Sequence, residues 1–313
     1  MKTNLRKRFQ GSLIGLAVGD ALGGKFEGQD ASYIQSRLPN LDALIHYPAE
    51  SLWYTDDTQM MIGVAETLLT NGSIQEERLC KAFVENYVPS RGYGRGARAI
   101  IEAMEEGRDY QLVAKTIFTG GSYGNGGAMR VAPVGLRFHL TPDRLIEQAI
   151  LSALPTHTHP LGIEGTTLMA IAVGLALTQA DDLNQAEFVS TLLKEAKQSE
   201  FKERLEKLAK IRFASEIPQL GNGIAAHESV VTAIACFLVN RDSFSQTIAE
   251  AIFLGGDTDT IAAMAGALSG AYLGIDEIPS HLIDKLEDTP KGKAYLFDLA
   301  NQLFEQLRSN SSI

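Results

Sequence analysis

Two short acidic clusters could do chemistry together. Residues 54–58 (YTDDT) come early in the chain, and residues 255–260 (GGDTDT) come late. Each cluster places two carboxylates and neighbouring threonine hydroxyls directly before a run of small or apolar residues that favours a buried helix. The simplest explanation of either cluster alone is helix capping, because Asp and Thr are favoured at helix starts and the helix dipole stabilises carboxylates there.

Capping leaves part of each cluster unexplained. One cap needs one side chain, whereas the clusters carry four carboxylates, on Asp56, Asp57, Asp257 and Asp259. If these side chains were buried near one another they would repel strongly unless a cation lay between them. Oxygen ligands without His or Cys suit a hard ion such as magnesium, calcium or manganese. The two clusters are therefore candidates for a two-metal site.

Two further acids stand near a glycine pair. Asp20 and Glu27 lie on either side of Gly23 and Gly24, at the end of an apolar first segment. Both are equally well explained as surface acids at a helix exit. Glu27, however, follows the glycine pair closely enough to sit on a mobile loop, where it could act as a general acid or base.

A glycine-rich stretch at residues 120–130 (GGSYGNGGAMR) could hold phosphate, because such a loop opening a helix presents backbone N–H groups. No GK[ST] follows it, which excludes a Walker A loop, and no strand precedes it, which disfavours a dinucleotide-binding fingerprint. Tyr123 within it could stack on a base or pack on the core.

His157 and His159 have a spacing found in zinc sites but lack a third ligand. Because Lys and Arg are scarce nearby, we expect amides and metal to hold any phosphate.

The elements that position these residues are predicted to be helices. Apolar residues recur at helical spacing over most of the chain, and no convincing alternating or hairpin pattern occurs. The segments with this spacing are 57–70, 75–88, 95–106, 142–153, 161–179, 184–197, 200–210, 224–239, 244–253, 258–273 and 293–308. We therefore predict an all-α protein.

One domain is expected over residues 1–313, because no Pro/Ser-rich linker divides the chain. The most polar stretch, 194–210, could be a linker or a solvent-exposed helix. Phe201, Leu205 and Leu208 give it an apolar stripe, which favours the helix. No repeat at a period of 20–50 residues occurs, which disfavours a solenoid.

Composition excludes several classes of protein. The 313 residues include 28 Lys and Arg against 38 Asp and Glu, so a net charge of −10 argues against a broad basic face for nucleic acid. Two distant cysteines and no CxxC pattern disfavour structural zinc and disulfides and suggest a cytoplasmic protein. The most apolar segments, 168–177 and 261–275, are shorter than the roughly 18 residues of a membrane span. The N-terminal segment reads as an amphipathic helix rather than a signal peptide.

Taken together, these motifs resemble the ADP-ribosylglycohydrolase family. The matching stretches are GSLIGLAVGDALGGKFEG (11–28), YTDDTQM (54–60), GSYGNGGAMRVAP (121–133), THTHPLG (156–162) and LGGDTDTIAAMAGALSGAYLG (254–274). The combination of TDDT early and GGDTDT late is specific. RGYG at 91–94 and LGNGIAAHESVVTAI at 220–234 are most similar to the branch that removes ADP-ribose from serine.

The resemblance implies a compact single-domain orthogonal helix bundle with a cleft for two metal ions. It further implies that the ions are magnesium, for which manganese could substitute, and it implies roles for individual residues. Implied metal ligands are Thr55, Asp56, Asp57, Asp257, Asp259 and Thr260. Implied catalytic residues are Glu27, Asp56 and Asp257. Implied substrate contacts are Asp56, Gly121, Ser122, Tyr123, Gly124, Asn125, Gly126, His157 and Ile224. Tyr123 would lie near the adenine, and Phe118 is close to the place of a second stacking aromatic but shifted by one. The region 195–220 is shorter than in vertebrate members.

The resemblance also implies a function. It predicts a magnesium-dependent hydrolase that releases ADP-ribose from serine on ADP-ribosylated proteins, and that acts also on poly(ADP-ribose) and O-acetyl-ADP-ribose. The alternative is an arginine-directed hydrolase of the dinitrogenase-reductase-activating type. Two remote alternatives are a non-catalytic ADP-ribose binder and a phosphatase of the DxDxT type that uses residues 257–260 (DTDT), although such a motif normally ends a buried strand. Neither membrane nor nucleic acid is an expected partner.

Overall fold

The computed structural model describes residues 4–179 and 183–310. These residues form helices, with no strand among them and only isolated β-bridges, so the prediction of an all-α protein is confirmed. The helices are α1 (Leu5–Gly23), α2 (Ala31–Arg37), α3 (Leu41–Ile45), α4 (Asp56–Asn71), α5 (Glu76–Asn86), η1 (Pro89–Arg91), α6 (Arg95–Glu105), α7 (Tyr110–Ile117), α8 (Ala132–Phe138), α9 (Pro142–Ala153), α10 (Pro160–Thr178), α11 (Gln185–Glu195), α12 (Ser199–Leu208), η2 (Ala214–Leu220), α13 (Ala226–Val239), α14 (Phe244–Phe253), α15 (Thr258–Leu273), η3 (Ile275–Glu277), α16 (Ser280–Lys285) and α17 (Lys293–Asn310).

Helices α1 and α15 pack against each other at the centre of the molecule. A Cβ added to Gly15 would lie 2.4 Å from the carbonyl oxygen of Gly266, and one added to Gly23 would lie 2.4 Å from that of Thr258. Glycine therefore lets the two backbones touch, and the order of the contacts makes the helices antiparallel. The first helix is buried on nearly all sides rather than amphipathic, which corrects the sequence prediction.

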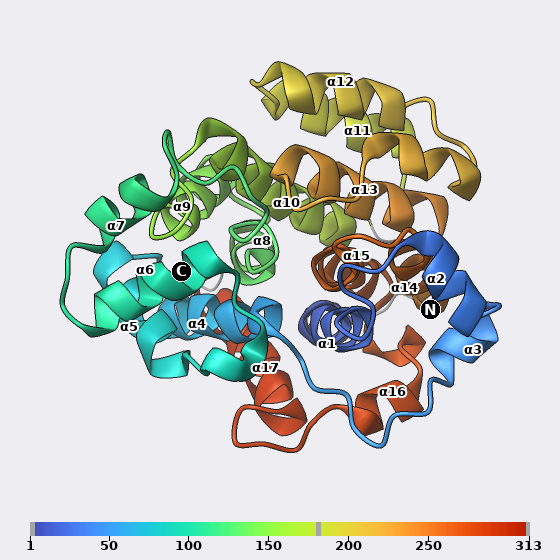
Figure 1. The fold of residues 1–313 in the computed structure, drawn as a ribbon, viewed down its shortest axis with the longest axis horizontal. Helices are drawn as coiled ribbons and strands as arrows, with labels where there is room; N and C mark the ends of the chain where they lie inside the picture. The colour runs from blue at the N-terminus through green and yellow to red at the C-terminus, as the bar shows by residue number, and fades with distance from the viewer. Residues whose placement is uncertain (1–3, 180–182, 311–313) are drawn as a thin grey trace.

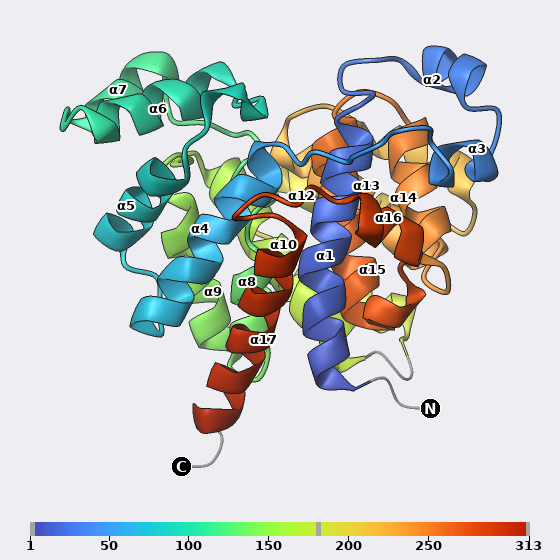
Figure 2. The same ribbon diagram turned by 90° about the horizontal axis from the view of Figure 1, so that it is seen from below.

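The remaining helices surround this pair. Figure 1 shows α1, α8 and α15 nearly end-on, whereas α11, α12 and α13 run across the view, so the bundle is orthogonal. Figure 2 shows α4 and α17 beside α1, with α5, α6 and α7 forming the outer edge on that side. One continuous set of buried apolar side chains joins the helices into a single core.

The apolar segment 168–177 belongs to a helix, α10, whose apolar stretch is longer than we estimated from the sequence. The helix spans Pro160–Thr178, and its 19 residues are long and apolar enough to cross a membrane by length and composition. However, 72% of its apolar window is buried inside the fold, where it packs against α8, α9, α13 and α15. These contacts are those of a core helix, because the apolar surface is already covered by protein.

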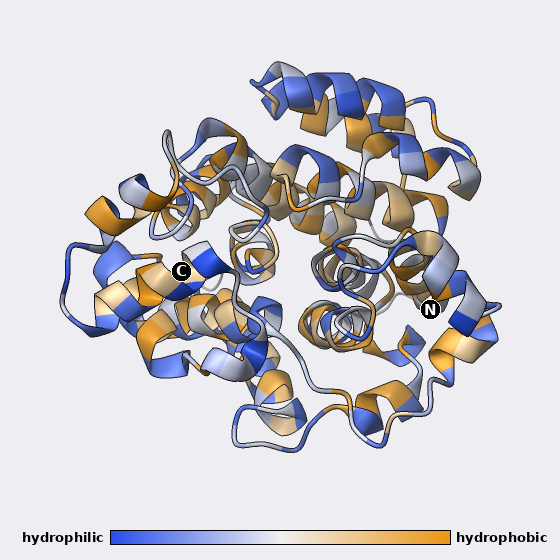
Figure 3. Cartoon of the chain, in the orientation of Figure 1, coloured by the Kyte–Doolittle hydropathy of each residue, from blue (hydrophilic) through white to orange (hydrophobic). Residues whose placement is uncertain are grey.

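The polar stretch 194–210 forms helix rather than linker, as predicted. It contains the end of α11 and the whole of α12, and the side chains of Phe201, Leu205 and Leu208 are fully buried. Figure 3 shows the hydrophilic residues of α12 on the outer side of the molecule. The apolar stripe thus packs inward while the charged residues face outward.

Candidate active site

The two acidic clusters meet because α4 and α15 both begin at the same end of the central pair. Asp56 and Asp57 lie in the first turn of α4, and Asp259 lies in the first turn of α15. Asp257 occupies the N-cap position of α15, yet its side chain makes no capping hydrogen bond. In α4 the cap is Thr55, whose hydroxyl accepts the backbone N–H of Asp57. Capping therefore does not account for the carboxylates.

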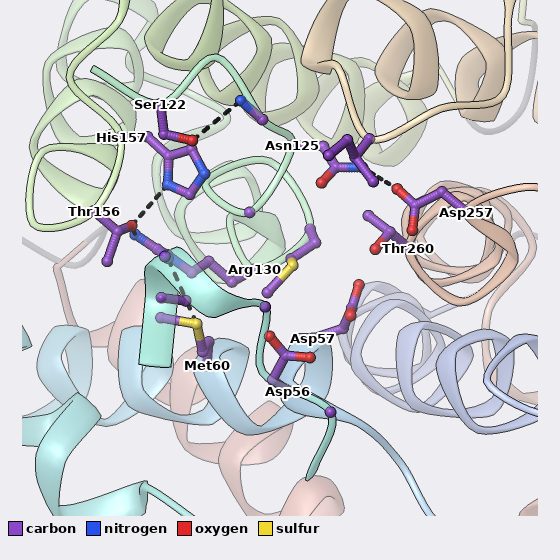
Figure 4. A pocket seen from close by; sticks show the side chains of 18 of the residues that line it. Asp56, Asp57, Met60, Ser122, Asn125, Arg130, Thr156, His157, Asp257 and Thr260 are labelled. Carbon is purple, nitrogen blue, oxygen red and sulfur yellow. Dashed lines mark hydrogen bonds between the residues drawn. The ribbon is translucent and has the colours of Figure 1, made fainter. Parts of the chain in front are cut away.

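A cavity of about 350 Å³ lies between these helix starts. Figure 4 shows Asp56 and Asp57 entering it from α4, Asp257 and Thr260 from α15, and His157 from the opposite wall. The predicted site residues that line it are Glu27, Asp56, Asp57, Ser122, Gly124, Asn125, Gly126, His157, Ile224, Asp257, Asp259 and Thr260. Phe118 lines the cavity too, with its ring packed over Gly96.

Three predicted residues lie beside the cavity rather than in its lining. The Thr55 hydroxyl donates to Oδ2 of Asp57 at 3.1 Å. Gly121 packs on the backbone of residues 158–159 with a φ of +91°, a conformation that favours glycine. Tyr123 is 52% exposed, and its ring meets the edge of His159 with centroids 5.8 Å apart. The packing on the core that Tyr123 could have made is therefore not observed.

The carboxylates of the two clusters repel one another in a buried site. Burial, followed by the neighbouring Asp20, raises the pKa of Asp56 to about 7. Burial and the adjacent Asp257 raise the pKa of Asp259 to about 9. Burial and Asp259 also raise the pKa of Asp57 well above its usual value. Each shift means that the ionised cluster needs a compensating positive charge.

The donor atoms fit a hard cation. Oδ1 of Asp57 is buried without a hydrogen-bond partner among the described residues. Carboxylate oxygens of Glu27, Asp257 and Asp259 lie within 4.8 Å of one another. Because every donor is a carboxylate or hydroxyl oxygen, the site suits magnesium, calcium or manganese rather than zinc. The cluster could thus bind a metal ion.

Asp20 is not a surface acid. It is completely buried, and its carboxylate accepts hydrogen bonds from the backbone N–H groups of Thr55 at 2.9 Å and Thr58 at 3.0 Å. The Thr58 hydroxyl donates to it as well, at 2.5 Å. Asp20 therefore reaches from the end of α1 to hold the first turn of α4. Sequence reasoning missed this role, because nothing in the spacing pairs residue 20 with residues 55–58.

Glu27 lies on a loop that is docked against the second acidic cluster. The backbone N–H of Gly28 donates to the carbonyl of Gly256, and the N–H of Gly256 donates to the carbonyl of Gln29, both at 2.8 Å. Burial and the nearby Asp257 raise the pKa of Glu27. Gly23, expected as part of a hinge, instead serves the close contact with α15. Movement of the loop stays a prediction.

The glycine-rich loop pairs with the segment before α13. The N–H of Asn125 donates to the carbonyl of Ile224, and the N–H of Ala226 donates to the carbonyl of Tyr123, both at 3.0 Å. The loop does not open directly into a helix as predicted, because α8 begins only at Ala132 after consecutive turns. Its glycines instead allow close packing, since a Cβ on Gly126 would lie 2.6 Å from the His157 ring.

A model of the family described as ADP-ribosylglycohydrolase matches residues 1–312. The chain belongs to the ADP-ribosylglycohydrolase family. It is 37% identical to ADP-ribosylhydrolase ARH3 of Danio rerio, over 87% of this chain and 84% of that protein. It is 28% identical to ADP-ribosyl-[dinitrogen reductase] glycohydrolase of Rhodospirillum rubrum, over 91% of this chain and 92% of that protein.

A solved structure described as an ADP-ribosylglycohydrolase-related protein complex shares the fold. Its TM-score is 0.74 at 24% identity, with 97% of this chain and 99% of that chain covered. This likeness shows the fold, and the family-model match together with the similarity to ADP-ribosylhydrolase ARH3 shows that the protein is an enzyme of the ADP-ribosylglycohydrolase class. The phosphatase alternative is wrong, because residues 257–260 begin α15 rather than end a strand.

A basic side chain in the wall of this glycohydrolase was missed from sequence. Arg130 is fully buried and lines the cavity, donating to the Ser152 carbonyl at 2.8 Å and to the Thr156 hydroxyl at 2.9 Å. Burial lowers its pKa to about 9, and burial together with Arg130 lowers the pKa of His157 to about 3. His157 is therefore a neutral ring. Arg95 also lines the cavity, so cations are less scarce there than the sequence suggested.

Proposed function

We propose that this enzyme is a magnesium-dependent hydrolase that releases ADP-ribose from ADP-ribosylated serine on proteins, using two metal ions. The observation that carries the proposal is the convergence of both acidic clusters and Glu27 on one cavity. The orphaned Oδ1 of Asp57 supports a cation there, because a buried carboxylate oxygen without a partner is costly. ADP-ribose has the vicinal ribose hydroxyls and the diphosphate that such a site could bind.

Residues in and beside the cavity suggest where each part of ADP-ribose would bind. Ser122, Gly124 and Gly126 line the cavity, as do Arg130 and the neutral His157, and the diphosphate would lie beside them. Tyr123 and Phe118 would flank the adenine. Residues Thr55, Asp56, Asp57, Asp257, Asp259 and Thr260 would hold the metals. When bound, the ions would fix the ribose hydroxyls and orient water by Lewis acidity.

Glu27 would move the proton in the hydrolysis. The bond between ribose C1″ and the serine oxygen breaks through an oxocarbenium-like state, and the oxygen of water bonds to C1″. Glu27 takes a proton from that water and afterwards returns it to solvent, while the departing serine oxygen takes up a proton from solvent, so that no proton is gained or lost overall. Its raised pKa suits this role, since a base works best when its pKa approaches the working pH.

The serine linkage is favoured over the arginine linkage by the chain's own motifs. RGYG at 91–94 and LGNGI at 220–224 resemble the serine-directed branch, and the identity is higher to the zebrafish ARH3 than to the Rhodospirillum rubrum enzyme. By the same resemblance we propose poly(ADP-ribose) and O-acetyl-ADP-ribose as further substrates. The arginine-directed activity is the second candidate, because the alignment with the bacterial enzyme spans 91% of the chain.

A substrate panel tests the proposal. Purified enzyme is given serine-linked, arginine-linked, polymeric and O-acetyl-linked ADP-ribose, each with magnesium, with manganese and with excess chelator, and the free ADP-ribose is quantified. We expect release from serine that requires the divalent ion. Release from arginine alone would replace the serine assignment, and full activity in chelator would remove the metal assignment.

We also propose a cytoplasmic setting, supported by two buried free cysteines.

A further inference from the structure

Tyr54 directly precedes Thr55, Asp56 and Asp57, which form the first metal-binding cluster. A segment from the other end of the chain holds Tyr54 in place. Glu287 is only 2% exposed, and its carboxylate accepts the backbone N–H of Tyr54 at 3.2 Å. Arg91 donates two hydrogen bonds to this carboxylate, at 2.5 and 2.6 Å, and a third to the carbonyl of Tyr54 at 2.7 Å. The guanidinium also lies 4.0 Å from the centre of the Tyr54 ring. We call these two charged residues the Arg91–Glu287 clamp.

Backbone pairing reinforces the clamp. The N–H of Leu52 donates to the carbonyl of Lys285 at 2.7 Å, and the N–H of Glu287 donates back to the carbonyl of Leu52 at 3.0 Å. The Tyr54 hydroxyl donates to the carbonyl of Lys291 at 3.2 Å. Figure 2 shows the segment between α16 and α17 running beside the one that leads into α4. The chain is thus fixed directly before Thr55 and Asp56.

The same clamp reaches the cavity wall. Arg91 is followed by Gly92, whose φ of +88° turns the chain into the cavity, where Gly92 and Gly94 form part of the lining. A Cβ on Gly92 would lie 3.9 Å from Oδ1 of Asp56. Arg91 therefore joins the segment that contains Tyr54 to the Gly92–Gly94 segment, and these two segments approach each other at Asp56.

Stability alone is a weak reason for such a pair. A buried ion pair gains little over well-packed apolar side chains, because both charges must leave water. The charged pair adds a fixed relative orientation, since a bidentate arginine–carboxylate contact holds both partners in one geometry. That geometry is transmitted to Thr55 and Asp56 through the backbone of Tyr54.

We propose that Arg91 and Glu287 are positioning residues, which set the first metal-binding cluster and the Gly92–Gly94 wall at the separation that substrate and metal require. This inference rests on the proposed function for the identity of the ligands. Arg91 and Glu287 do not line the cavity themselves, and because they set the position of residues that would bind metal and substrate, their effect must appear in binding as well as in turnover.

The test compares Arg91→Lys, Glu287→Gln and Thr289→Val with the wild type, on full-length protein. Thr289 donates to Oε2 of Glu287 at 3.0 Å, and its replacement loosens the clamp without removing a charge. Phe188→Leu on α11, at a fully buried residue that does not line the cavity, serves as the control for lost stability. Dissociation constants for magnesium and for ADP-ribose are measured by calorimetry below each variant's unfolding temperature.

We expect Arg91→Lys and Glu287→Gln to weaken magnesium binding by about tenfold, within the range seen when partners of ligand residues are removed. Thr289→Val should shift it less, in the same direction, and decides the matter where Glu287→Gln does not fold. The proposal is overturned if folded clamp variants bind magnesium and ADP-ribose as the wild type does, or if Phe188→Leu weakens binding equally. Wild-type protein that binds no magnesium would refute the metal assignment. The proposal for the clamp would then be decided by whether the clamp variants bind ADP-ribose more weakly than the wild type.

Discussion

The side-chain amide of Asn125 donates a hydrogen bond to Oδ2 of Asp257 at 2.5 Å and another to the hydroxyl of Ser229 at 3.0 Å. Asn125 belongs to the glycine-rich loop, and its backbone is held by the carbonyl of Ile224. Three segments that are far apart in sequence therefore meet at one carboxylate of the acidic cavity. The resemblance places Asn125 among the substrate contacts, and the structure adds that it orients Asp257.

Replacing Asn125 should therefore weaken metal binding at the proposed site. Asn125→Asp puts a carboxylate beside Asp257 and removes the amide donor, so we expect kcat to fall and the magnesium needed for half-maximal activity to rise by about 10–100-fold. Ser229→Ala is the matched control, because it removes the other partner of the same amide without adding charge, and should have a much smaller effect. Magnesium titrations of both variants check this. Equal magnesium requirements in Asn125→Asp and wild type would contradict it.

The catalytic role proposed for the Glu27 carboxylate can be tested without disturbing the rest of its loop. Glu27→Gln removes the proton acceptor while keeping the shape, so kcat should drop by about 10²–10⁴, the usual contribution of a positioned acid or base. ADP-ribose affinity should stay close to that of the wild type, since the diphosphate would lie at the glycine-rich loop. Asp30→Asn is the control, because Asp30 is an exposed acid that caps α2 and does not line the cavity. Turnover near the wild-type rate in Glu27→Gln would remove the catalytic assignment.

The helices and the acidic clusters could be predicted from sequence because their causes are local. The stripe of Phe201, Leu205 and Leu208 predicts a helix with one buried face, and the structure has that helix. The charge pattern of Asp56 and Asp57 at a helix start exceeds what capping needs, which pointed to a metal. Such signals depend on neighbours within about one helical turn.

The supports of the site could not be predicted, because each joins residues that are distant in sequence. Asp20 bonds to Thr58, and Arg91 bonds to Glu287, 196 positions later. No local pattern distinguishes these side chains from surface charges. Arg130 was part of a recognised motif, yet only the structure places its guanidinium in the cavity wall.

The glycine contact between α1 and α15 should be sensitive to a single methyl group. In Gly266→Ala the new Cβ would lie 2.2 Å from the carbonyl oxygen of Gly15, and a backbone atom cannot rotate away. We expect the free energy of unfolding to fall by about 1–3 kcal/mol or more, as in other overpacked cores. Gly94→Ala is the control, since a Cβ there meets nothing within 4 Å. Urea unfolding measures both, and equal stability would contradict the close packing.

The stability of the metal-free protein should depend on pH in the opposite sense to that of ordinary salt-bridged carboxylates. The pKa is raised by burial to about 6 for Asp20, about 7 for Asp56 and about 9 for Asp259. Between the pKa of the unfolded chain, 3.8, and these raised values, the folded protein holds protons that the unfolded chain has released. The contribution of these three groups to stability is then fully present below about pH 4 and is lost as the pH rises towards 9.

Metal should reverse this loss, because a bound cation favours the ionised carboxylates of the folded state. In EDTA we expect the free energy of unfolding to fall by at least about 3 kcal/mol between pH 5 and pH 8, since each retained proton contributes about 1.4 kcal/mol per pH unit. With excess magnesium the decrease should shrink or disappear, because binding to the folded state alone stabilises it. Asp259→Asn, which cannot ionise, should flatten the profile in EDTA and weaken the response to magnesium. Urea unfolding at the two pH values measures all four cases, and a metal-free wild type that is more stable at pH 8 than at pH 5 would show that the carboxylates are not in mutual repulsion.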